Sequence, residues 1–326
     1  LRYLFREKKN VHIRVAELES VHPHEDYLMT SEGRVNYEIL VLATGVTTNY
    51  YGNVQIEKNT YSLKSVSDAL YLRNALLADL EKALTIREDD VRQQYLDLVI
   101  VGGGPTGVEL AGSLAEFKKY ILSKEYPELN AGEMDIHLIH GNPELLNSMS
   151  NEASAKARQY LERLGVHVRT GVRVMDYDGK EISLNNGEKL ATRKVIWSAG
   201  ITGKRLAGMP ESIYTNDNRI KTDGCSRVEG FSNIYALGDA AYMEEGKYKG
   251  HPQVAQPAIQ QSRALALNLN RLAKGKSMQP FHYKDLGSMA TVGRNKAVVE
   301  LRLFKFGGLP AWMVWMAVHL MSIVGV

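Results

Sequence analysis

Hydrophobic runs of four to six residues recur along the chain, and each run is followed by a glycine. Longer segments separate the runs, and in these segments apolar residues return at the spacing of a helix. Short apolar runs that alternate with helical segments are typical of α/β folds with parallel sheets. The pattern therefore predicts an α/β fold that presents functional residues at the carboxyl ends of its strands.

Five runs locate the predicted strands. The first, residues 39–42, is expected to form a buried strand that leads into Ala43, Thr44 and Gly45. The other four lie within residues 98–101, 135–141, 195–200 and 233–239. Because parallel strands end at one edge of a sheet, the residues that follow these runs are the candidates for function.

Two further signals organise the chain. Residues 65–84 have apolar positions at helical spacing behind Ser65 or Ser67, and they predict a capped helix that connects two domains. An Asn186-Gly187 pair between two short strand-like runs predicts a β-hairpin.

Composition excludes several classes of protein. With 44% hydrophobic and 24% charged residues, the 326-residue chain can bury the cores of two domains and is not disordered. Its 40 basic and 37 acidic residues form no basic stripe, so nucleic acid is not an expected partner. Cys225 is the single cysteine, which excludes an internal disulfide, a thiol redox pair and a cysteine metal cluster.

Gly102, Gly104 and Gly107 form a G-x-G-x-x-G motif directly after a predicted strand and at the start of a predicted helix. In that context Gly102 allows the tight turn, Gly104 lets the backbone approach a pyrophosphate, and Gly107 lets the helix pack on the strand. The helix N-terminus would offer unpaired N–H groups to the phosphates. The motif predicts a dinucleotide site rather than a chance glycine turn.

The residue that reads the ribose is expected at the end of the next strand, where an acidic side chain usually accepts from the 2′-OH. This chain has His140 there. A histidine is no fixed anionic acceptor, and a charged one would tolerate a 2′-phosphate. NADH is the favoured nucleotide and NADPH the alternative; a surface role for His140 without any nucleotide contact explains it equally well.

Asp239 ends the last of the five runs, directly after a glycine. A Gly-Asp pair alone is not specific. Together with the upstream strand that leads into Ala43, Thr44 and Gly45, it predicts two strand ends of one FAD-binding domain that the other dinucleotide domain interrupts. Asp239 would hold the ribityl hydroxyl of FAD, and an ordinary surface turn is the alternative.

Three more side chains are candidates for the reaction. Gln256 and Gln260 lie four apart near the start of a predicted helix and would aim two amides at one object. Glutamines on a solvated helix face are the alternative. Glu109, two residues after Gly107, would orient a nicotinamide carboxamide or simply favour a helix N-terminus.

The last eighteen residues, 309–326, contain no Lys, Arg, Asp or Glu. Pro310 opens a predicted helix in which Trp312 and Trp315 suit the headgroup level of a membrane. The stretch is just short of the roughly 20 residues that span a bilayer. An interfacial anchor is favoured over a spanning helix, and a C-terminal helix buried in a water-soluble domain is the alternative.

These residues resemble the type II NADH dehydrogenases, the single-subunit, non-proton-pumping NADH:quinone oxidoreductases. The similarity runs along the whole chain and is carried by ILVLATGVTTNYYGN, VIVGGGPTGVELAG, YPELN, VIWSAGITG, NIYALGDAAYME, GHPQVAQPAIQQ and GSMATVGRNKAV. The helix start at residues 255–260 and the last of these segments separate this family from flavoprotein reductases in general.

The resemblance implies two Rossmann-like domains, an FAD domain interrupted by an NADH domain, with a C-terminal membrane-associating segment. It implies hydride transfer from NADH to FAD and then delivery of two electrons to a membrane quinone without proton pumping. The implied contacts are, for FAD, Ala43, Thr44, Gly45 and Asp239; for NADH, Gly102, Gly104, Thr106, Gly107 and Glu109; for a cofactor, Gly200; and for the quinone, Gln256 and Gln260.

The same resemblance predicts boundaries and setting. The expected parts are an FAD domain at 1–60 and 206–285, a connecting segment at 61–96, an NAD(P)H domain at 97–205 and a membrane-anchoring region at 286–326. The first FAD glycine motif is expected before Leu1, and further anchor helices after Val326. The expected protein is peripheral, at the cytoplasmic face of a bacterial membrane, with a membrane quinone, the membrane surface and a second copy of the chain as partners.

Two other functions keep this fold. One is a soluble FAD-dependent NAD(P)H oxidase or reductase with another acceptor, against which the hydrophobic C-terminal stretch argues. The other is a flavoprotein that senses NADH and turns over little, which the rate of flavin reoxidation by quinone would distinguish from an enzyme.

Overall fold

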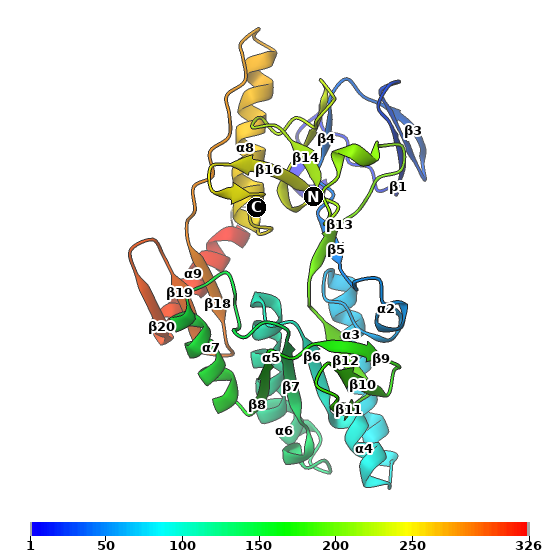
Figure 1. The fold of residues 1–326 in the computed structure, drawn as a ribbon, viewed down its shortest axis with the longest axis vertical. Coiled ribbons are helices and arrows are strands. Elements are labelled where there is room, and N and C mark those ends of the chain that lie inside the picture. The colour runs from blue at the N-terminus through cyan, green and yellow to red at the C-terminus, as the bar shows by residue number, and fades with distance from the viewer. Residues whose placement is uncertain (1, 325–326) are drawn as a thin grey trace. The chain divides into compact units, whose positions relative to one another are not determined.

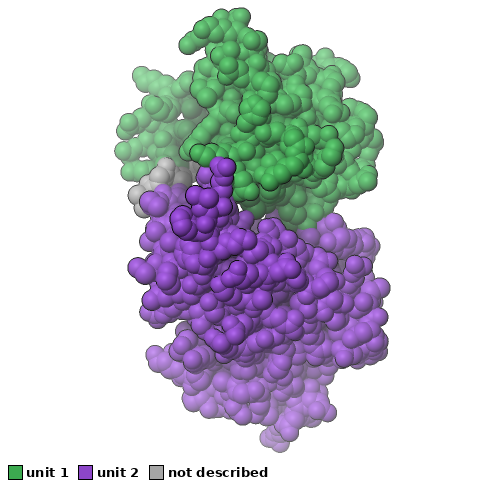
Figure 2. All heavy atoms as spheres, turned by 60° about the vertical axis from the view of Figure 1, so that its left-hand side comes forward, with its two compact units in different colours: residues 1–47, 201–285, 326 green, residues 48–200, 286–325 purple. Residues whose placement is uncertain are grey.

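The computed structural model describes the backbone of residues 2–324 and the side chains of residues 2–322. The chain forms two compact units (Figure 2). Unit 1 comprises residues 1–47 and 201–285, and unit 2 comprises residues 48–200 and 286–325. Unit 1 is therefore built from two stretches of chain that are separated in the sequence by most of unit 2.

Unit 2 is organised around a parallel sheet in the order β12-β6-β7-β8 (Figure 1). Its strands are β6 (Leu98–Val101), β7 (Ile136–His140), β8 (Val166–Thr170) and β12 (Lys194–Trp197). Helix α5 (Pro105–Phe117) connects β6 to β7, and α7 (Asn151–Arg163) connects β7 to β8. These strand–helix–strand connections confirm the predicted α/β fold.

Neighbouring residues of β6 face opposite sides of this sheet, as the two-residue period of a strand requires. Leu98 and Ile100 pack in one apolar cluster with residues of α5 and α7. Val99 and Val101 pack in a second cluster that includes Tyr177. All four strand residues are buried, so the predicted buried strand at residues 98–101 is confirmed.

The predicted connecting helix is α3 (Val66–Thr85), and Ser65 is its cap. The Ser65 hydroxyl accepts the Asp68 N–H, and the Asp68 carboxylate accepts the Ser65 N–H, which together form a capping box. Asp79 of α3 forms an ion pair of 2.6 Å with Lys194, whose side chain is buried in β12. This pair ties α3 to the parallel sheet, and residues 61–96 accordingly belong to unit 2.

Two antiparallel sheets complete unit 2. The predicted hairpin at Asn186-Gly187 is confirmed, because β10 (Glu181–Leu184) pairs with β11 (Lys189–Ala191). The remaining strands are β9 (Val174–Tyr177), β18 (Ser288–Thr291), β19 (Ala297–Glu300) and β20 (Lys305–Gly308). The remaining helices are α2 (Val54–Asn59), α4 (Asp89–Leu96), α6 (Ser123–Glu125) and α9 (Leu309–Val324).

Unit 1 contains the parallel pair β4 (Leu40–Leu42) and β15 (Ile234–Ala236), with Leu42 opposite Ala236. Its other strands are β1 (Leu18–His22), β2 (Tyr27–Thr30), β3 (Gly33–Asn36), β14 (Ile220–Thr222), β16 (Ala241–Glu245) and β17 (Tyr248–Lys249). Its helices are α1 (Arg2–Phe5) and α8 (Ala255–Leu272). The chain passes between the units near β5 (Val46–Thr48) and β13 (Ile201–Gly203).

The expectation that residues 39–42 form a fully buried strand is wrong in one respect. Leu40 and Leu42 are buried in the core of unit 1, but Ile39 is 48% exposed and Val41 is 39% exposed. Because strand side chains alternate, only one face of β4 packs on that core.

The C-terminal helix α9 is 16 residues long. Within residues 2–324, no helix combines the length and apolarity needed to cross a membrane. Trp312 and Trp315 are partly buried and pack against Ala297, Val299 and Ala311 in the cluster at β19, and their expected place at a headgroup level stays a prediction. The exposed large apolar side chains of α9 are Leu309, Met313, Leu320 and Met321.

Candidate functional site

The turn between β6 and α5 packs backbone directly against backbone. Gly102 has φ +117°, which residues with a side chain rarely adopt, and a Cβ there would lie 2.6 Å from the carbonyl carbon of Ser198. A Cβ on Gly107 would lie 1.8 Å from the Gly102 carbonyl oxygen. Only glycine fits at either position, and the result is that α5 begins in direct contact with the end of β6.

The first turn of α5 is open to a ligand. Gly104 is the N-cap of α5, and no side chain caps the helix. A Cβ added to Gly104 would have no other atom within 4 Å. Pro105 and Thr106 follow it, and both are exposed. Uncapped N–H groups and the positive end of the helix dipole suit a pyrophosphate at this position.

His140, at the end of β7, packs against the same turn. Its Nδ1 accepts the Gly103 N–H at 3.0 Å, and its Nε2 lies 3.1 Å from Asn147 Oδ1. A backbone N–H can only donate, so Nδ1 is unprotonated and Nε2 donates to Asn147. Both ring nitrogens are engaged, and the side chain supports the glycine turn instead of offering a free acceptor.

A cation lies beside the residue that follows β7. A Cβ on Gly141 would lie 3.1 Å from Cγ and 3.4 Å from Nε of Arg173. Arg173 is exposed, and in the described part of the chain its guanidinium has no carboxylate partner. An arginine at this strand end, without an acidic residue, can accommodate a 2′-phosphate.

Glu109 faces the interior of unit 2. Its Oε1 accepts the N–H of Thr291 in β18 at 3.2 Å. Burial raises the pKa of this carboxyl, and the Thr291 N–H, the charge of His319 and the Trp315 indole offset only part of that rise. The Trp315 N–H itself completes no hydrogen bond of normal geometry within the described residues. Glu109 therefore protonates more readily than an ordinary glutamate, and its contacts are with β18 and α9.

Gly200, after β12, makes room for a neighbouring tyrosine. It has φ +90°, and a Cβ there would lie 2.3 Å from the Tyr51 hydroxyl oxygen. Its carbonyl also accepts the Asn49 N–H at 3.2 Å. The need for glycine at this position therefore has a structural cause within unit 2.

In unit 1 the two predicted strand ends lie side by side. The Leu237 N–H, just after β15, donates to the carbonyl of Leu42 at 3.1 Å. Ala43 and Thr44 are exposed, and Gly45 has φ +65° with open space around a Cβ. The structure thus brings residues 43–45 next to the turn that carries Asp239, as the sequence predicted.

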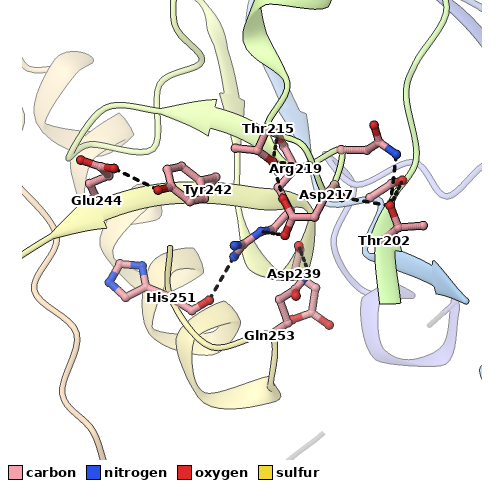
Figure 3. Close-up of polar contacts among 11 residues, drawn as sticks. Thr202, Thr215, Asp217, Arg219, Asp239, Tyr242, Glu244, His251 and Gln253 are labelled. Atoms are coloured by element: carbon pink, nitrogen blue, oxygen red, sulfur yellow. Dashed lines mark hydrogen bonds and ion pairs between the residues drawn. The ribbon is translucent and has the colours of Figure 1, made fainter. Parts of the chain in front are cut away.

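Asp239 lies in the short 3₁₀ turn η4 (Gly238–Ala240), which is held by residues that follow it (Figure 3). The Gln253 amide donates to the Asp239 carbonyl at 3.0 Å. The Gln261 Oε1 accepts the Gly238 N–H at 2.7 Å. A Cβ on Gly238 would lie 3.2 Å from Ala258 Cβ of α8, so the turn also packs closely on that helix.

The two predicted glutamines of α8 differ in their contacts. The Gln260 amide donates to the Lys284 carbonyl at 2.9 Å and accepts the Lys284 N–H at 3.0 Å. Both polar atoms of Gln260 therefore clamp the backbone of another segment. Gln256, one turn earlier, is partly exposed, and its side chain makes no hydrogen bond with the residues that the structure describes.

Gln253 and Gln261, which hydrogen-bond the Asp239 turn, were not anticipated, nor was His251, which contacts Gln261. Gln261 adjoins Gln260 in the sequence, but it is 2% exposed and lies on the buried face of α8 with Pro257 and Leu265. These apolar residues lie four before and four after Gln261. That spacing was the signal that could have placed Gln261 inside.

Residues 3–262 match the family described as pyridine nucleotide-disulphide oxidoreductase. The match includes both strand-end turns. The fold and the two turns therefore define a nucleotide-dependent oxidoreductase of this class.

Two curated relatives come from Mycobacterium tuberculosis. Type II NADH:quinone oxidoreductase NdhA is 30% identical over an alignment of 341 positions, gaps included, which covers 99% of this chain and 72% of that protein. Type II NADH:quinone oxidoreductase Ndh is 31% identical over 304 residues, with 89% of this chain and 64% of that protein covered. The chain belongs to the type II NADH:quinone oxidoreductases within the pyridine nucleotide-disulphide oxidoreductase family, which confirms the resemblance found in the sequence.

A solved structure shares the fold. It is described as NDH2 from Plasmodium falciparum in complex with NADH, and it matches with a TM-score of 0.88 at 22% identity over 97% of this chain and 82% of that chain. The chain itself spans 64% of the length of Ndh.

Proposed function

We propose that the protein is an FAD-dependent NADH:quinone oxidoreductase that passes two electrons from NADH to a membrane quinone without pumping protons. The observation that carries the proposal is the pair of strand-end turns, one in each unit: the glycine turn at the start of α5, and the turn at Asp239 beside residues 43–45. Both M. tuberculosis relatives are named for this activity, and the family match supports a pyridine nucleotide.

Unit 2 would bind the nicotinamide nucleotide. Its turn fits the pyrophosphate, because a Cβ at Gly104 meets open space and no side chain caps the helix behind it. The backbone at Gly102 and Gly107 sets the turn, and the exposed Thr106 hydroxyl would donate to a phosphate oxygen. Gly200 keeps the end of the neighbouring strand β12 free of a side chain. NADH is the favoured reductant, and Arg173 beside Gly141 makes NADPH the second candidate.

Unit 1 would hold FAD, which when bound supplies the two-electron carrier between the nucleotide and the quinone. The residues fit this group because Ala43 and Thr44 are exposed and small, and Gly45 leaves open space, beside the turn that carries Asp239. The Asp239 carboxylate would accept a ribityl hydroxyl. Gln253 and Gln261 fix the backbone of its turn, so that carboxylate is held at a defined place.

The quinone is assigned to the start of α8. Gln256 has a side-chain amide with capacity to donate to a quinone carbonyl, whereas Gln260 supports the site by clamping Lys284. Glu109 would hold a proton in unit 2, since burial raises the pKa of its carboxyl.

Association with a membrane surface is proposed through α9. Its exposed Leu309, Met313, Leu320 and Met321 are apolar side chains of the kind that enter a headgroup region. The proposed setting is the cytoplasmic face of a bacterial membrane, where NADH and quinone are both accessible. A second copy of the chain is a further candidate partner, which sedimentation in detergent would detect.

Anaerobic stopped-flow absorbance of the complete, FAD-loaded protein tests the proposal. NADH is expected to bleach the flavin absorbance. Quinone mixed in afterwards is expected to restore that absorbance within seconds. A flavin that NADH leaves oxidised would contradict the proposed function. A flavin that stays reduced for minutes after quinone addition would instead identify an NADH sensor.

A further inference from the structure

A buried histidine stands behind the Asp239 turn. The His251 side chain is 3% exposed and is enclosed by the rings of Tyr248, Phe281 and Tyr283, whose centroids lie 5.3 to 5.5 Å from its own. Its backbone is also fixed, because the Arg219 guanidinium donates to its carbonyl (Figure 3). Asp217 in turn holds Arg219 at 2.8 Å. The imidazole is therefore confined by three aromatic rings and anchored through its own backbone.

The hydrogen bonds around His251 determine where its proton lies. The Gly238 N–H is a donor, so the Gln261 atom 2.7 Å from it is the carbonyl Oε1. The Gln261 NH₂ group therefore faces His251 Nδ1 at 3.3 Å, and Nδ1 must be an unprotonated acceptor. The proton is then on Nε2, which lies 2.8 Å from Glu245 Oε2.

Glu245 is suited to accept that proton's hydrogen bond. Burial tends to raise the pKa of its carboxyl, but hydrogen bonds from the Tyr283 N–H, His251 and His282 outweigh burial and lower it. Glu245 is therefore a carboxylate. Every donor in this series therefore meets an acceptor: His251 Nε2–H donates to Glu245, the Gln261 NH₂ group donates to His251 Nδ1, and the Gly238 N–H donates to Gln261 Oε1.

We propose that His251, as the neutral tautomer with its proton on Nε2, is a positioning residue that acts through Gln261 to fix the Gly238–Asp239 turn for flavin binding. The inference rests on the proposed flavin role of Asp239. If His251 could not accept at Nδ1, Gln261 would have to rotate to satisfy its buried NH₂ group. Its Oε1 would then leave the Gly238 N–H, and a buried backbone donor would lose its partner.

Two substitutions of His251 distinguish the effect of its Nδ1 acceptor from the effect of its ring packing. His251→Asn places Oδ1 where Nδ1 was, so it keeps an acceptor for Gln261. His251→Phe keeps the aromatic packing and has no acceptor. His282→Ala is the matched control, because His282 also contacts Glu245, at 3.2 Å, but its side chain is 82% exposed and it does not contact Gln261.

The experiment measures the FAD dissociation constant of the complete protein and the hydrogen exchange of residues 236–240 in flavin-free protein. His251→Phe is expected to weaken FAD binding about tenfold or more and to remove the protection of Gly238. His251→Asn is expected to remain within about threefold of wild type and to keep that protection, as is His282→Ala.

Equal FAD affinity in His251→Phe and wild type would overturn the proposal, and so would loss in His251→Asn as large as in His251→Phe. The hydrogen-exchange measurement tests whether His251 acts on Gly238 through Gln261, and it does so without flavin. Suppose that His251→Phe removes the protection of Gly238, His251→Asn keeps it, and the complete protein binds no FAD. That result would refute the flavin role of Asp239 and would leave the effect of His251 on Gln261 intact.

Discussion

The two strand-end turns are built in different ways. In unit 2 the turn after β6 depends on close backbone contact between Gly102 and Gly107 at the start of α5, and the His140 side chain supports it by accepting the Gly103 N–H. In unit 1 the turn after β15 is held by side chains from farther along the chain, Gln253 and Gln261, with His251 behind them.

The two turns are therefore sensitive to different substitutions. The close backbone contact at Gly102 and Gly107 leaves no room for a side chain at these two positions, so an added Cβ there is harmful. A turn held by a series of side-chain hydrogen bonds depends on whether each group is a donor or an acceptor. A substituted side chain of similar size that lacks the required donor or acceptor is therefore harmful.

The largest effect is expected from Gly107→Ala. The added Cβ would lie 1.8 Å from the Gly102 carbonyl oxygen, so β6 and α5 must separate. Nucleotide binding should be lost, and the melting temperature should fall, since overpacking costs about 1–3 kcal/mol even where side chains can yield. Isothermal titration with NADH and a thermal melt measure the two effects.

Gly104→Ala is the control for that prediction. Its Cβ would meet open space, so the melting temperature should fall far less than in Gly107→Ala, by no more than the small loss expected for alanine at an N-cap. A pyrophosphate that approaches the backbone there should bind more weakly. If both variants lose stability equally, the steric account of this turn is wrong.

The next effect concerns the choice of nucleotide. Arg173→Ala should lower kcat/KM for NADPH about tenfold while changing that for NADH little, because only NADPH brings a phosphate to the end of β7. His140→Glu should shift the ratio in the same direction. Steady-state assays with both nucleotides test this, and an unchanged ratio in both variants would show that this strand end does not read the 2′ position.

A smaller effect is expected from Glu109→Gln as the pH is varied. Because the pKa of Glu109 is raised in the folded protein above its ordinary value of 4.5, the folded state keeps a proton that the unfolded chain has released. The stability this group contributes is complete below that ordinary value and is lost as the pH rises through the raised pKa. Glutamine does not titrate, so the melting temperature of the variant should gain on wild type as the pH rises; a constant difference would refute the assignment.

The smallest effects are expected at the start of α8. Gln260→Ala removes two hydrogen bonds to the Lys284 backbone and should cost about 1 kcal/mol of unfolding free energy, together with a higher quinone KM. Gln256→Ala should raise the quinone KM without a change in stability. A quinone KM that neither substitution alters would remove this helix face from the acceptor site.

Much of the fold could be predicted from the sequence, because its signals are local. The run at residues 98–101, the glycines that follow it, the Ser65 cap and the Asn186-Gly187 turn each act on neighbouring residues, and each is found where it was predicted. The exposed Val41 was not anticipated, since exposure depends on what covers the other face of a strand.

The contacts of the site were harder to predict, because they join residues far apart in the sequence. Helical spacing grouped Gln256 with Gln260, but the residue that contacts the Asp239 turn is Gln261. The apolar Pro257 and Leu265 at four-residue spacing mark Gln261 as buried, but they do not show which group it contacts. Similarly, no spacing rule shows that His140 accepts the Gly103 N–H, or that Glu109 is covered by β18 and α9.

The most direct test of the account is steady-state NADH oxidation by the complete protein reconstituted with FAD, measured with a quinone analogue and with O2 alone. The account predicts a flavin-dependent rate that quinone raises well above the O2 rate. A protein that stays colourless after incubation with FAD, or that oxidises NADH no faster with quinone than with O2, would contradict it.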